Sequence, residues 1–489
     1  MTKDFNASDY ESPFEKGTLN CQLYRIPAIY TLNDGSVVAA ADMRYNHGSD
    51  SPNNIDTLVA TSKNGYGNWQ YNIINYFDDY ADDLTEPASA SFIDSAIGQS
   101  KKTGRVFIVT DCYPSGGGVL TCKKGSGYIK INDKDYLALS KRGDNNQKYY
   151  VSDFKNGFAE ILNINDNGKT DYFVDEEYNI YSNGKPAQMK QVGSNKNINQ
   201  NVFYKNADFT VMCTTYLWLR YSDDNCKTWS KPVILNPFVK LEKDGFIGAA
   251  PGRMTTVEYN GHERIIFMVY DHDKAGNEDV FTVYSDDNGV TWKRGKKVSH
   301  SFAVGKTSEC QIVKVNNGVL RMFCRNRGDY VAFCDSTDGG FSWTKAHCIE
   351  ALTARGNCML SFINTSKTVD GKPVILGSYA SNQNERADGV ISVGVLNDNN
   401  TIDWISKYHV NDKFFAYSCL TELSDGNFAY LYEDEPAHIS YMILSLDESG
   451  RLTEINGNNI VFNKNQSEKA VMSFFKNLKN KLNKIFNLM

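Results

Sequence analysis

The chain has 489 residues, a net charge of -6 and a pI near 5.8. This mildly acidic balance argues against nucleic acid or an anionic surface as the main partner, so we expect no nucleic-acid partner. Hydrophobic residues make up 41% of the chain and charged residues 22%, which excludes a disordered or collagen-like protein. The 29 Tyr and 26 Phe, against only 11 Pro, favour β structure.

The first 18 residues, MTKDFNASDYESPFEKGT, lack the basic start and apolar run of a secretion signal. No apolar stretch approaches the roughly 20 residues that span a bilayer. We therefore expect a protein that is cytoplasmic or exported by another route. The 11 Cys form no CxxC pair and no cluster at zinc spacing, so we expect reduced thiols, no metal and no cofactor.

Four octets repeat one pattern along the chain. SKNGYGNW, SDDNCKTW, SDDNGVTW and STDGGFSW begin at residues 62, 222, 285 and 336, and the last three share Ser-x-Asp-x-Gly-x-Thr/Ser-Trp, with Cys226 in place of one Gly. The Asp/Asn-Gly step suits a tight turn with positive φ, and the Trp can pack beneath it. We interpret the octets as turn and core staples. Calcium sites are the competing interpretation, although the spacing is not that of an EF-hand.

Between the octets, two alternating runs joined by a turn-forming step recur, which predicts β-hairpins. Three clear copies turn at Asp34-Gly35, Asn317-Gly318 and Asp425-Gly426, and three less regular copies lie at 91–111, 254–271 and 359–380. Four hairpins precede an octet, and the last two precede degenerate versions of it. Six units of about four antiparallel strands predict an all-β fold, a six-bladed β-propeller.

The spacing of the units fails once. The octets that begin at 62 and 222 are 160 residues apart, whereas those that begin at 222 and 285 are 63 residues apart. About 90 extra residues therefore lie in the second unit. Their Tyr-rich runs, separated by Asn/Asp/Gly turns, predict a small β insertion, for which a lid or substrate-contacting flap is the functional interpretation. The predicted organisation is a polar lead at 1–20, a propeller at 21–113 and 209–462, the insertion at 114–208 and a tail at 463–489.

Pairing each hairpin about its turn places polar side chains at the open ends. The pairs are Arg25 with Arg44, Glu309 with Arg325, and Tyr417 with Glu433, while Asp50 and Arg386 follow just beyond two open ends. At about 3.3 Å per residue, the eight or so residues from turn to open end span roughly 26 Å, the height of a blade. The third strand runs back toward the turns, so the octets fall on the opposite face from these side chains.

Four of these side chains are arginines. Each alone is most simply a solvated or paired surface group, but several that converge would repel one another unless they served an anion. The guanidinium fork suits a carboxylate. A Glu beside a Tyr, with a loop Asp, supplies a base, a nucleophile and an acid. The recurrence at matching positions therefore favours an anion site with its own chemistry.

With these motifs, the chain resembles the sialidases (exo-α-sialidases or neuraminidases) of glycoside hydrolase family thirty-three. Tyr-Arg-Ile-Pro at 24–27 is similar to the family's Arg-Ile-Pro motif, and the octets are similar to its Asp-boxes. The resemblance runs from about residue 22 to 445 and includes the insertion, which looks like the extra β domain of larger bacterial enzymes. Asp-boxes alone also occur in non-catalytic propellers, so the combination of motifs carries the resemblance.

The resemblance implies a role for each of the polar residues. Tyr417 is similar to the family's nucleophile, Glu309 to its base and Asp50 to its acid/base catalyst. Arg44 is similar to a further arginine near O4 of the sugar, a role that Asp94 shares. The carboxylate of sialic acid would be held by a triad of arginines: Arg25, Arg325 and Arg386. Glu433 is similar to the acid that orients the first of them, Arg25.

This resemblance implies release of terminal α-linked sialic acid from glycans, glycoproteins or gangliosides, with retention, through a tyrosyl-glycoside. A carboxylate nucleophile would be repelled by the carboxylate on the anomeric carbon, whereas a neutral phenol would not. Two alternatives stay open: an intramolecular trans-sialidase that releases an anhydro sugar, and a non-catalytic Asp-box propeller that binds sialylated ligands. The first shares every residue above and differs in the aromatic groups around the aglycone.

The tail EKAVMSFFKNLKNKLNKIFNLM, residues 468–489, places apolar side chains at helical spacing among five Lys and one Glu. This pattern predicts a C-terminal basic amphipathic helix. Contact with a membrane surface is one interpretation of it, and docking on the propeller or on another subunit is the other.

Overall fold

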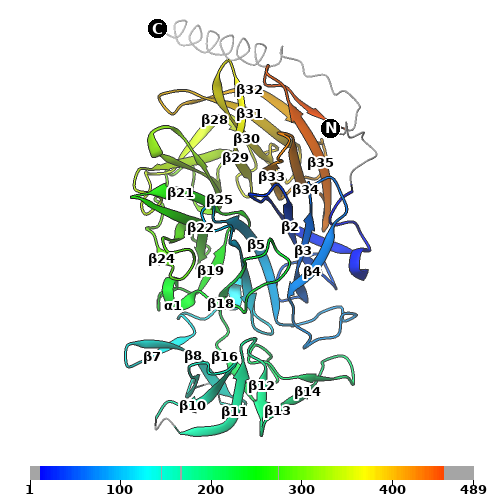
Figure 1. The fold of residues 1–489 in the computed structure, drawn as a ribbon, viewed down its shortest axis with the longest axis vertical. Helices are drawn as coiled ribbons and strands as arrows, with labels where there is room; N and C mark the ends of the chain where they lie inside the picture. Colours follow the sequence, from blue (N-terminus) through cyan, green and yellow to red (C-terminus); the bar gives the residue numbers. More distant parts are fainter. Residues whose placement is uncertain (1–10, 145, 166–167, 274, 456–489) are drawn as a thin grey trace, which may run out of the picture.

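The computed structural model describes residues 11–144, 146–165, 168–273 and 275–455, and it is almost entirely β. The predicted six-bladed propeller is confirmed: six antiparallel sheets follow one another along the chain as blades (Figure 1). The predicted helix at 468–489 lies outside the described residues. Among the residues that are described, no helix has the length and apolar character needed to cross a membrane.

Two of the three less regular hairpins lie in the first three blades, and the third lies in blade 5. Blade 1 is β1 (Leu23–Thr31), β2 (Val37–Arg44), β3 (Ile55–Ser62) and β4 (Gln70–Asn75). Blade 2 is β5 (Ser91–Gln99), β6 (Val106–Tyr113), β17 (Tyr216–Ser222) and β18 (Val233–Ile234), with β20 (Gly252–Arg253) parallel to β5. Blade 3 is β19 (Phe246–Ala249), β21 (Thr255–Tyr259), β22 (His262–His272), β23 (Glu278–Ser285) and β24 (Lys293–Arg294).

The last three blades are regular four-stranded sheets. Blade 4 is β25 (Thr307–Lys314), β26 (Leu320–Asn326), β27 (Tyr330–Ser336) and β28 (His347–Thr353). Blade 5 is β29 (Ser361–Val369), β30 (Lys372–Ala380), β31 (Gly389–Leu396) and β32 (Ile402–His409). Blade 6 is β33 (Ser418–Glu422), β34 (Phe428–Glu435), β35 (His438–Leu446) and β36 (Leu452–Glu454). The short helices are α1 (Asn236–Val239), η2 (Thr18–Asn20), η3 (Val119–Thr121) and η4 (Asn316–Gly318).

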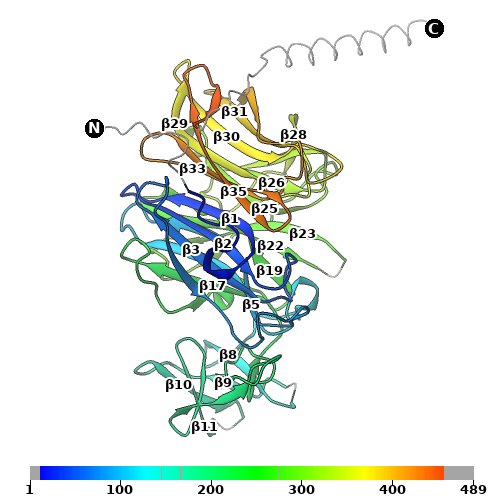
Figure 2. The same cartoon turned by 90° about the vertical axis from the view of Figure 1, so that its right-hand side faces the viewer.

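The insertion forms a separate lobe at one end of the propeller, between β6 and β17 (Figures 1 and 2). Its strands are β7 (Tyr128–Ile131), β8 (Lys134–Lys141), β9 (Tyr149–Val151), β10 (Phe158–Asn163), β11 (Lys169–Asp175), β12 (Ile180–Ser182), β13 (Lys185–Pro186), β14 (Gln188–Lys190), β15 (Asn197–Asn199) and β16 (Phe209–Val211). Strand β16 pairs with β8, so the strands of this lobe extend three residues beyond the predicted end at 208.

The octets are closed turns. In SDDNGVTW, the Ser285 hydroxyl accepts the Gly289 N–H at 2.8 Å, and Asp287 Oδ1 accepts the Thr291 N–H at 2.9 Å. The same bonds recur in the octets that begin at 222 and 336, and Trp292 is 2% exposed. These contacts support the interpretation of the octets as staples, since their polar groups bond one another and the Trp packs into the core.

Register places the octets and the predicted site residues at opposite ends of the sheets. In blade 1, Val37 pairs with Ser62, the start of an octet, while Arg44 pairs with Ile55 at the far end. The core that holds this arrangement lies between neighbouring blades, where the apolar side chains of adjacent sheets interdigitate. Packing between the blades therefore fixes the positions of the open hairpin ends.

Candidate active site

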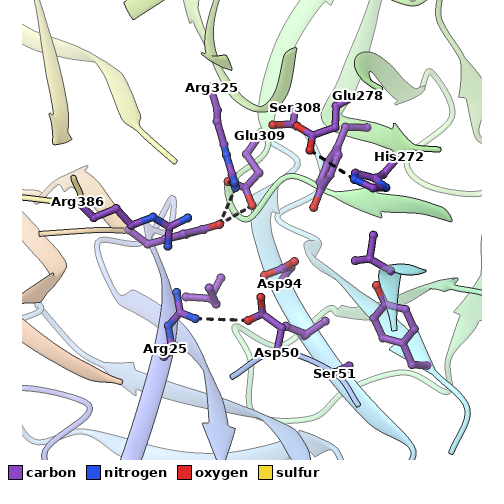
Figure 3. A pocket seen from close by; sticks show the side chains of 16 residues that line it. Arg25, Asp50, Ser51, Asp94, His272, Glu278, Ser308, Glu309, Arg325 and Arg386 are labelled. Carbon is purple, nitrogen blue, oxygen red and sulfur yellow. Dashed lines mark hydrogen bonds and ion pairs between the residues drawn. The ribbon is translucent and has the colours of Figure 1, made fainter. Parts of the chain in front are cut away.

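A cavity of about 200 Å³ opens among the hairpin ends. Figure 3 shows Arg25, Arg325 and Arg386 on one side of it and His272 with Glu278 on the opposite side. Seven of the nine predicted site residues line the cavity: Arg25, Asp50, Asp94, Glu309, Arg325, Arg386 and Tyr417. The other two, Arg44 and Glu433, are buried outside the lining and act on residues that belong to it.

Tyr417 stands immediately before β33, opposite Glu433 across the sixth hairpin, where the Glu433 N–H donates to its carbonyl at 2.8 Å. The Tyr417 hydroxyl donates to Glu309 Oε1 at 2.7 Å and accepts from Arg325 Nη1 at 2.8 Å. Burial raises the pKa of Tyr417 well above its ordinary value, although Arg325 and Arg386 act in the opposite direction. The resting phenol is therefore neutral, and Glu309 is already placed to take its proton.

Two of the three predicted carboxylate-binding arginines share a partner, because Arg325 and Arg386 both donate to Asn357. Arg25 donates from Nε and Nη2 to the two oxygens of the fully buried Glu433, at 3.1 and 3.3 Å. Arg325 donates from Nε and Nη2 to Asn357 Oδ1 at 3.3 and 2.8 Å. Arg386 lies with its guanidinium 5.4 Å from the centre of the Tyr417 ring. Their forks converge on one side of the cavity, a geometry that suits a single carboxylate.

Asn357 was not identified from the sequence. It precedes the fifth hairpin, whose turn lies at Asp370-Gly371, so pairing that hairpin about its turn would have placed it at the open end. The lining residues Tyr113, Tyr270, His272 and Glu278 were missed as well, because nothing in their local pattern separates them from ordinary strand ends.

Asp50 is the exposed member of the site. Its side chain is 64% exposed, and it accepts from Arg44 Nη1 at 2.9 Å and from Arg25 Nη1 at 3.4 Å. The protein atoms around the carboxyl reduce its hydration despite this exposure, which favours the neutral form, but Arg44 and Arg25 outweigh this and hold the pKa of Asp50 below its ordinary value. With no substrate bound, Asp50 is therefore ionised.

Arg44 is fully buried and stands behind Asp50. It donates to Asp50, to the Gly48 carbonyl at 2.6 Å and to Asp42 at 2.7 Å. The sequence interpretation placed Arg44 near O4 of the sugar. In this structure the guanidinium orients the Asp50 loop, and its contact with a sugar stays a prediction.

Asp94 lines the cavity in a left-handed conformation, with φ of 66°. Its own N–H donates to Asp42 Oδ1 at 3.1 Å. Burial and the nearby charges of Asp42 and Glu309 raise the pKa of the Asp94 carboxyl well above its ordinary value. A neutral carboxyl at this position can donate a hydrogen bond to a ligand, which a carboxylate cannot.

A repeated contact explains why acids are buried behind the site. On the second strand of a blade, a buried carboxylate accepts an N–H from the first strand of the next blade. Glu433 accepts from Ile26 at 2.9 Å, Asp42 accepts from Asp94, and Asp111 accepts from Ala249 at 2.9 Å. The contact accompanies a bulge in β1 and in β5. Beyond the bulge in β1, Arg25 pairs with Asp42 and Arg44 pairs with Leu23, so the predicted pairing of Arg25 with Arg44 is wrong by two residues.

Comparisons with known proteins identify the family. The model of the BNR repeat-like domain matches residues 196–429. The chain is 33% identical over 449 residues to an anhydrosialidase of Macrobdella decora and 30% identical over 461 residues to sialidase B of Streptococcus pneumoniae. These matches cover 84% and 87% of the chain, and the chain spans 58% and 64% of the length of these curated relatives.

One relative of known structure is matched over nearly its whole length. The crystal structure of the intramolecular trans-sialidase from Ruminococcus gnavus is 32% identical, with a TM-score of 0.81, and the match covers 92% of the present chain and 98% of the other. The propeller, the insertion and the arginine-rich cavity thus occur together in a chain that belongs to the sialidases, a family of glycoside hydrolases.

Proposed function

We propose that the protein is an exo-α-sialidase that releases terminal α-linked sialic acid from glycans, with retention, through a covalent bond to Tyr417. The observation that carries the proposal is the hydrogen-bonded set of Glu309, Tyr417 and Arg325 on the wall of the cavity. A binding protein would not need a buried phenol paired with a carboxylate, so this set also argues against the non-catalytic alternative.

Substrate binding begins with the carboxylate. Arg25, Arg325 and Arg386 take it, which places the anomeric carbon near the Tyr417 oxygen and offsets the negative charge. Glu309 then accepts the phenolic proton as the oxygen of Tyr417 bonds to the anomeric carbon and the bond to the aglycone oxygen breaks. The phenol is neutral before this step, so it approaches the anionic sugar without charge repulsion.

Asp50 protonates the aglycone oxygen in this scheme. In the empty site it is ionised because Arg44 and Arg25 pair with it. When the substrate carboxylate takes over Arg25, Asp50 loses one cation and gains a neighbouring anion, and both changes raise its pKa. The substrate itself thereby prepares Asp50 as the acid. In the second step the Asp50 carboxylate takes a proton from water as the water oxygen bonds to the anomeric carbon, and the bond from that carbon to Tyr417 breaks as the phenolic oxygen recovers its proton from Glu309.

A second product is supported by the relatives. Two of them are an anhydrosialidase and an intramolecular trans-sialidase, and the leech intramolecular trans-sialidase was solved with 2,7-anhydro-Neu5Ac. In this alternative a hydroxyl of the bound sugar replaces water as the attacking group, while every residue keeps its role. The product is then an internal ether that is one water lighter than free sialic acid.

Reaction of an α-sialyllactose in water enriched in oxygen-18 distinguishes the two outcomes. Hydrolysis gives free sialic acid that carries the heavy isotope at the anomeric hydroxyl, whereas the intramolecular reaction gives an anhydro sugar without it; mass spectrometry and NMR read both. Absence of any sialic acid product from the wild-type protein would contradict the proposed activity altogether. Production of the anhydro sugar alone would contradict hydrolysis and leave the Tyr417 mechanism in place.

A further inference from the structure

A second cavity lies where the insertion meets the propeller. Its volume is about 420 Å³, larger than that of the arginine-rich cavity. The propeller contributes aromatic side chains from the residue after β4, from β17 and from the last residue of an octet, whereas the insertion contributes carboxamides. The members that the argument uses are Tyr76, Trp218, Trp229, Asn179, Asn199 and Asn201. We call this cavity the junction groove.

Direct contacts hold the two walls of the junction groove together. Arg220 of the propeller donates to both oxygens of Glu177 of the insertion, at 3.1 and 2.6 Å. The Tyr204 hydroxyl of the insertion donates to Asp78 Oδ1 at 2.9 Å, and Phe203 packs edge-on against Trp218 with ring centres 5.4 Å apart. The groove therefore exists before any ligand arrives, which lowers the entropy cost of binding one.

The chemistry of the lining suits a sugar. The C–H face of a pyranose ring packs on aromatic side chains, and its hydroxyls need both donors and acceptors at short range. Tyr76 is 65% exposed and offers such an aromatic surface. The amides of Asn179 and Asn201 are bonded within the insertion, whereas Asn199 Nδ2 donates to no other described residue and can donate to a hydroxyl of a saccharide.

Two donors in this lining have no acceptor. The indole N–H groups of Trp218 and Trp229 are buried, and neither has a hydrogen-bond partner within the described part of the chain. Both nitrogen atoms are shielded from the groove, and Trp343, outside this lining, has the same unpaired N–H, so Trp218 and Trp229 offer a ligand their ring surfaces and not a donor.

Charge decides which class of sugar fits. The lining contains Asp78, Glu177 and Arg220, and the guanidinium of Arg220 is committed to Glu177, to Asn75 and to the Ser230 carbonyl. No cation among these lining residues is left for an anion, in contrast to the three convergent arginines of the first cavity. An acidic sugar would meet net negative charge here.

We propose that the junction groove is a second carbohydrate-binding site, specific for a neutral saccharide. It would hold the neutral part of a glycan independently of the chemistry in the first cavity. The rival explanation is a cavity with only a structural role, in which the same side chains pack the insertion onto the propeller and no ligand binds.

Saturation-transfer NMR on the full chain tests this proposal, with lactose and a desialylated branched oligosaccharide as probes. Sugar sites of this kind bind weakly, so titration to roughly 10 mM is needed. We expect saturation transfer to both neutral probes, and we expect it to persist in excess free sialic acid. No transfer to either probe would overturn the proposal, and so would its loss on addition of free sialic acid.

Two variants assign the signal to the groove. Tyr76→Ala and Asn199→Ala change exposed side chains, and each should weaken the binding of the neutral probes at least several-fold. Tyr71→Ala, on the strand that precedes Tyr76 but outside the groove lining, is the matched control and should leave binding unchanged. All three variants should release an aryl aglycone from a small sialoside at the wild-type rate. Unchanged probe binding in Tyr76→Ala would overturn the proposal even if the sialidase activity were absent.

Discussion

The two cavities differ in how their polar groups are paired. In the first, arginines and carboxylates meet at distances of about 3 Å, and the buried phenol of Tyr417 lies among them. In the junction groove, aromatic faces and amides dominate, and the single arginine is committed to a carboxylate. The first cavity therefore presents three convergent guanidinium groups, whereas the second presents aromatic surfaces and neutral amides. Substitutions and conditions that affect one cavity should therefore leave the other intact.

The substitution Tyr417→Phe should give the largest difference between the effects on the two cavities. This change removes the attacking oxygen and leaves the ring, so we expect kcat for a natural sialoside to fall on the order of 10³-fold or more. Binding of neutral sugar in the junction groove should not change. Steady-state kinetics and NMR on the same preparation measure both quantities. An active Tyr417→Phe variant would contradict the covalent mechanism.

Asp50→Ala should produce an effect that depends on the leaving group. General acid catalysis contributes about 10²–10⁴-fold when the leaving oxygen needs a proton. We therefore expect a loss in that range for α-sialyllactose and a much smaller loss for an aryl sialoside whose phenol leaves as an anion. Equal losses for the two substrates would show that Asp50 does not act as the acid.

Arg386→Ala should weaken binding more than chemistry. Removing one hydrogen bond to a charged group costs about 1.5–3 kcal/mol, which corresponds to roughly 10- to 100-fold in kcat/KM. We expect most of this change in KM, since Tyr417 and Glu309 keep their contact. Lys407→Ala, which removes a cation that does not line the cavity, is the control. A loss confined to kcat would contradict a role of Arg386 in holding the carboxylate.

A change in ionic strength should affect ligand binding in the two cavities differently, and this is the smallest of the expected effects. Raising salt from about 0.1 to 1 M shortens the Debye length from roughly 10 to 3 Å. KM for an anionic sialoside should then rise a few-fold, whereas binding of lactose in the junction groove should stay constant. An equal response of the two would show that charge does not separate them. Parallel titrations at matched pH measure the two responses.

Much of the fold could be predicted because its signal repeats. The hairpins recur six times and the octets four times, so period and strand pairing followed from the sequence, and so did the face on which Arg25, Glu309 and Tyr417 lie. Features that occur only once were harder to predict from the sequence. The bulge at Ile26, with φ of 56°, changes the partner of Arg25, and no local pattern marks a β-branched residue for that conformation.

The site was predictable to the extent that it lies at hairpin ends. Asn357 lies at such an end but follows an irregular segment, and it was missed. Arg44 was identified, yet its full burial behind Asp50 depends on how two neighbouring blades pack, which pairing within one hairpin does not describe. Contacts between blades, such as Asp42 with the Asp94 N–H, are set by the whole ring and not by a sequence window.

The bond between Arg25 and Glu433 joins the first blade to the last. These residues are separated by 408 positions, and Glu433 also accepts the Ile26 N–H. Arg25 thus joins the two ends of the ring, and Glu433 cannot hold its guanidinium until the final blade has docked. During refolding, recovery of carboxylate binding would show when the first and last blades have packed together. The amount of β structure alone would not show this step.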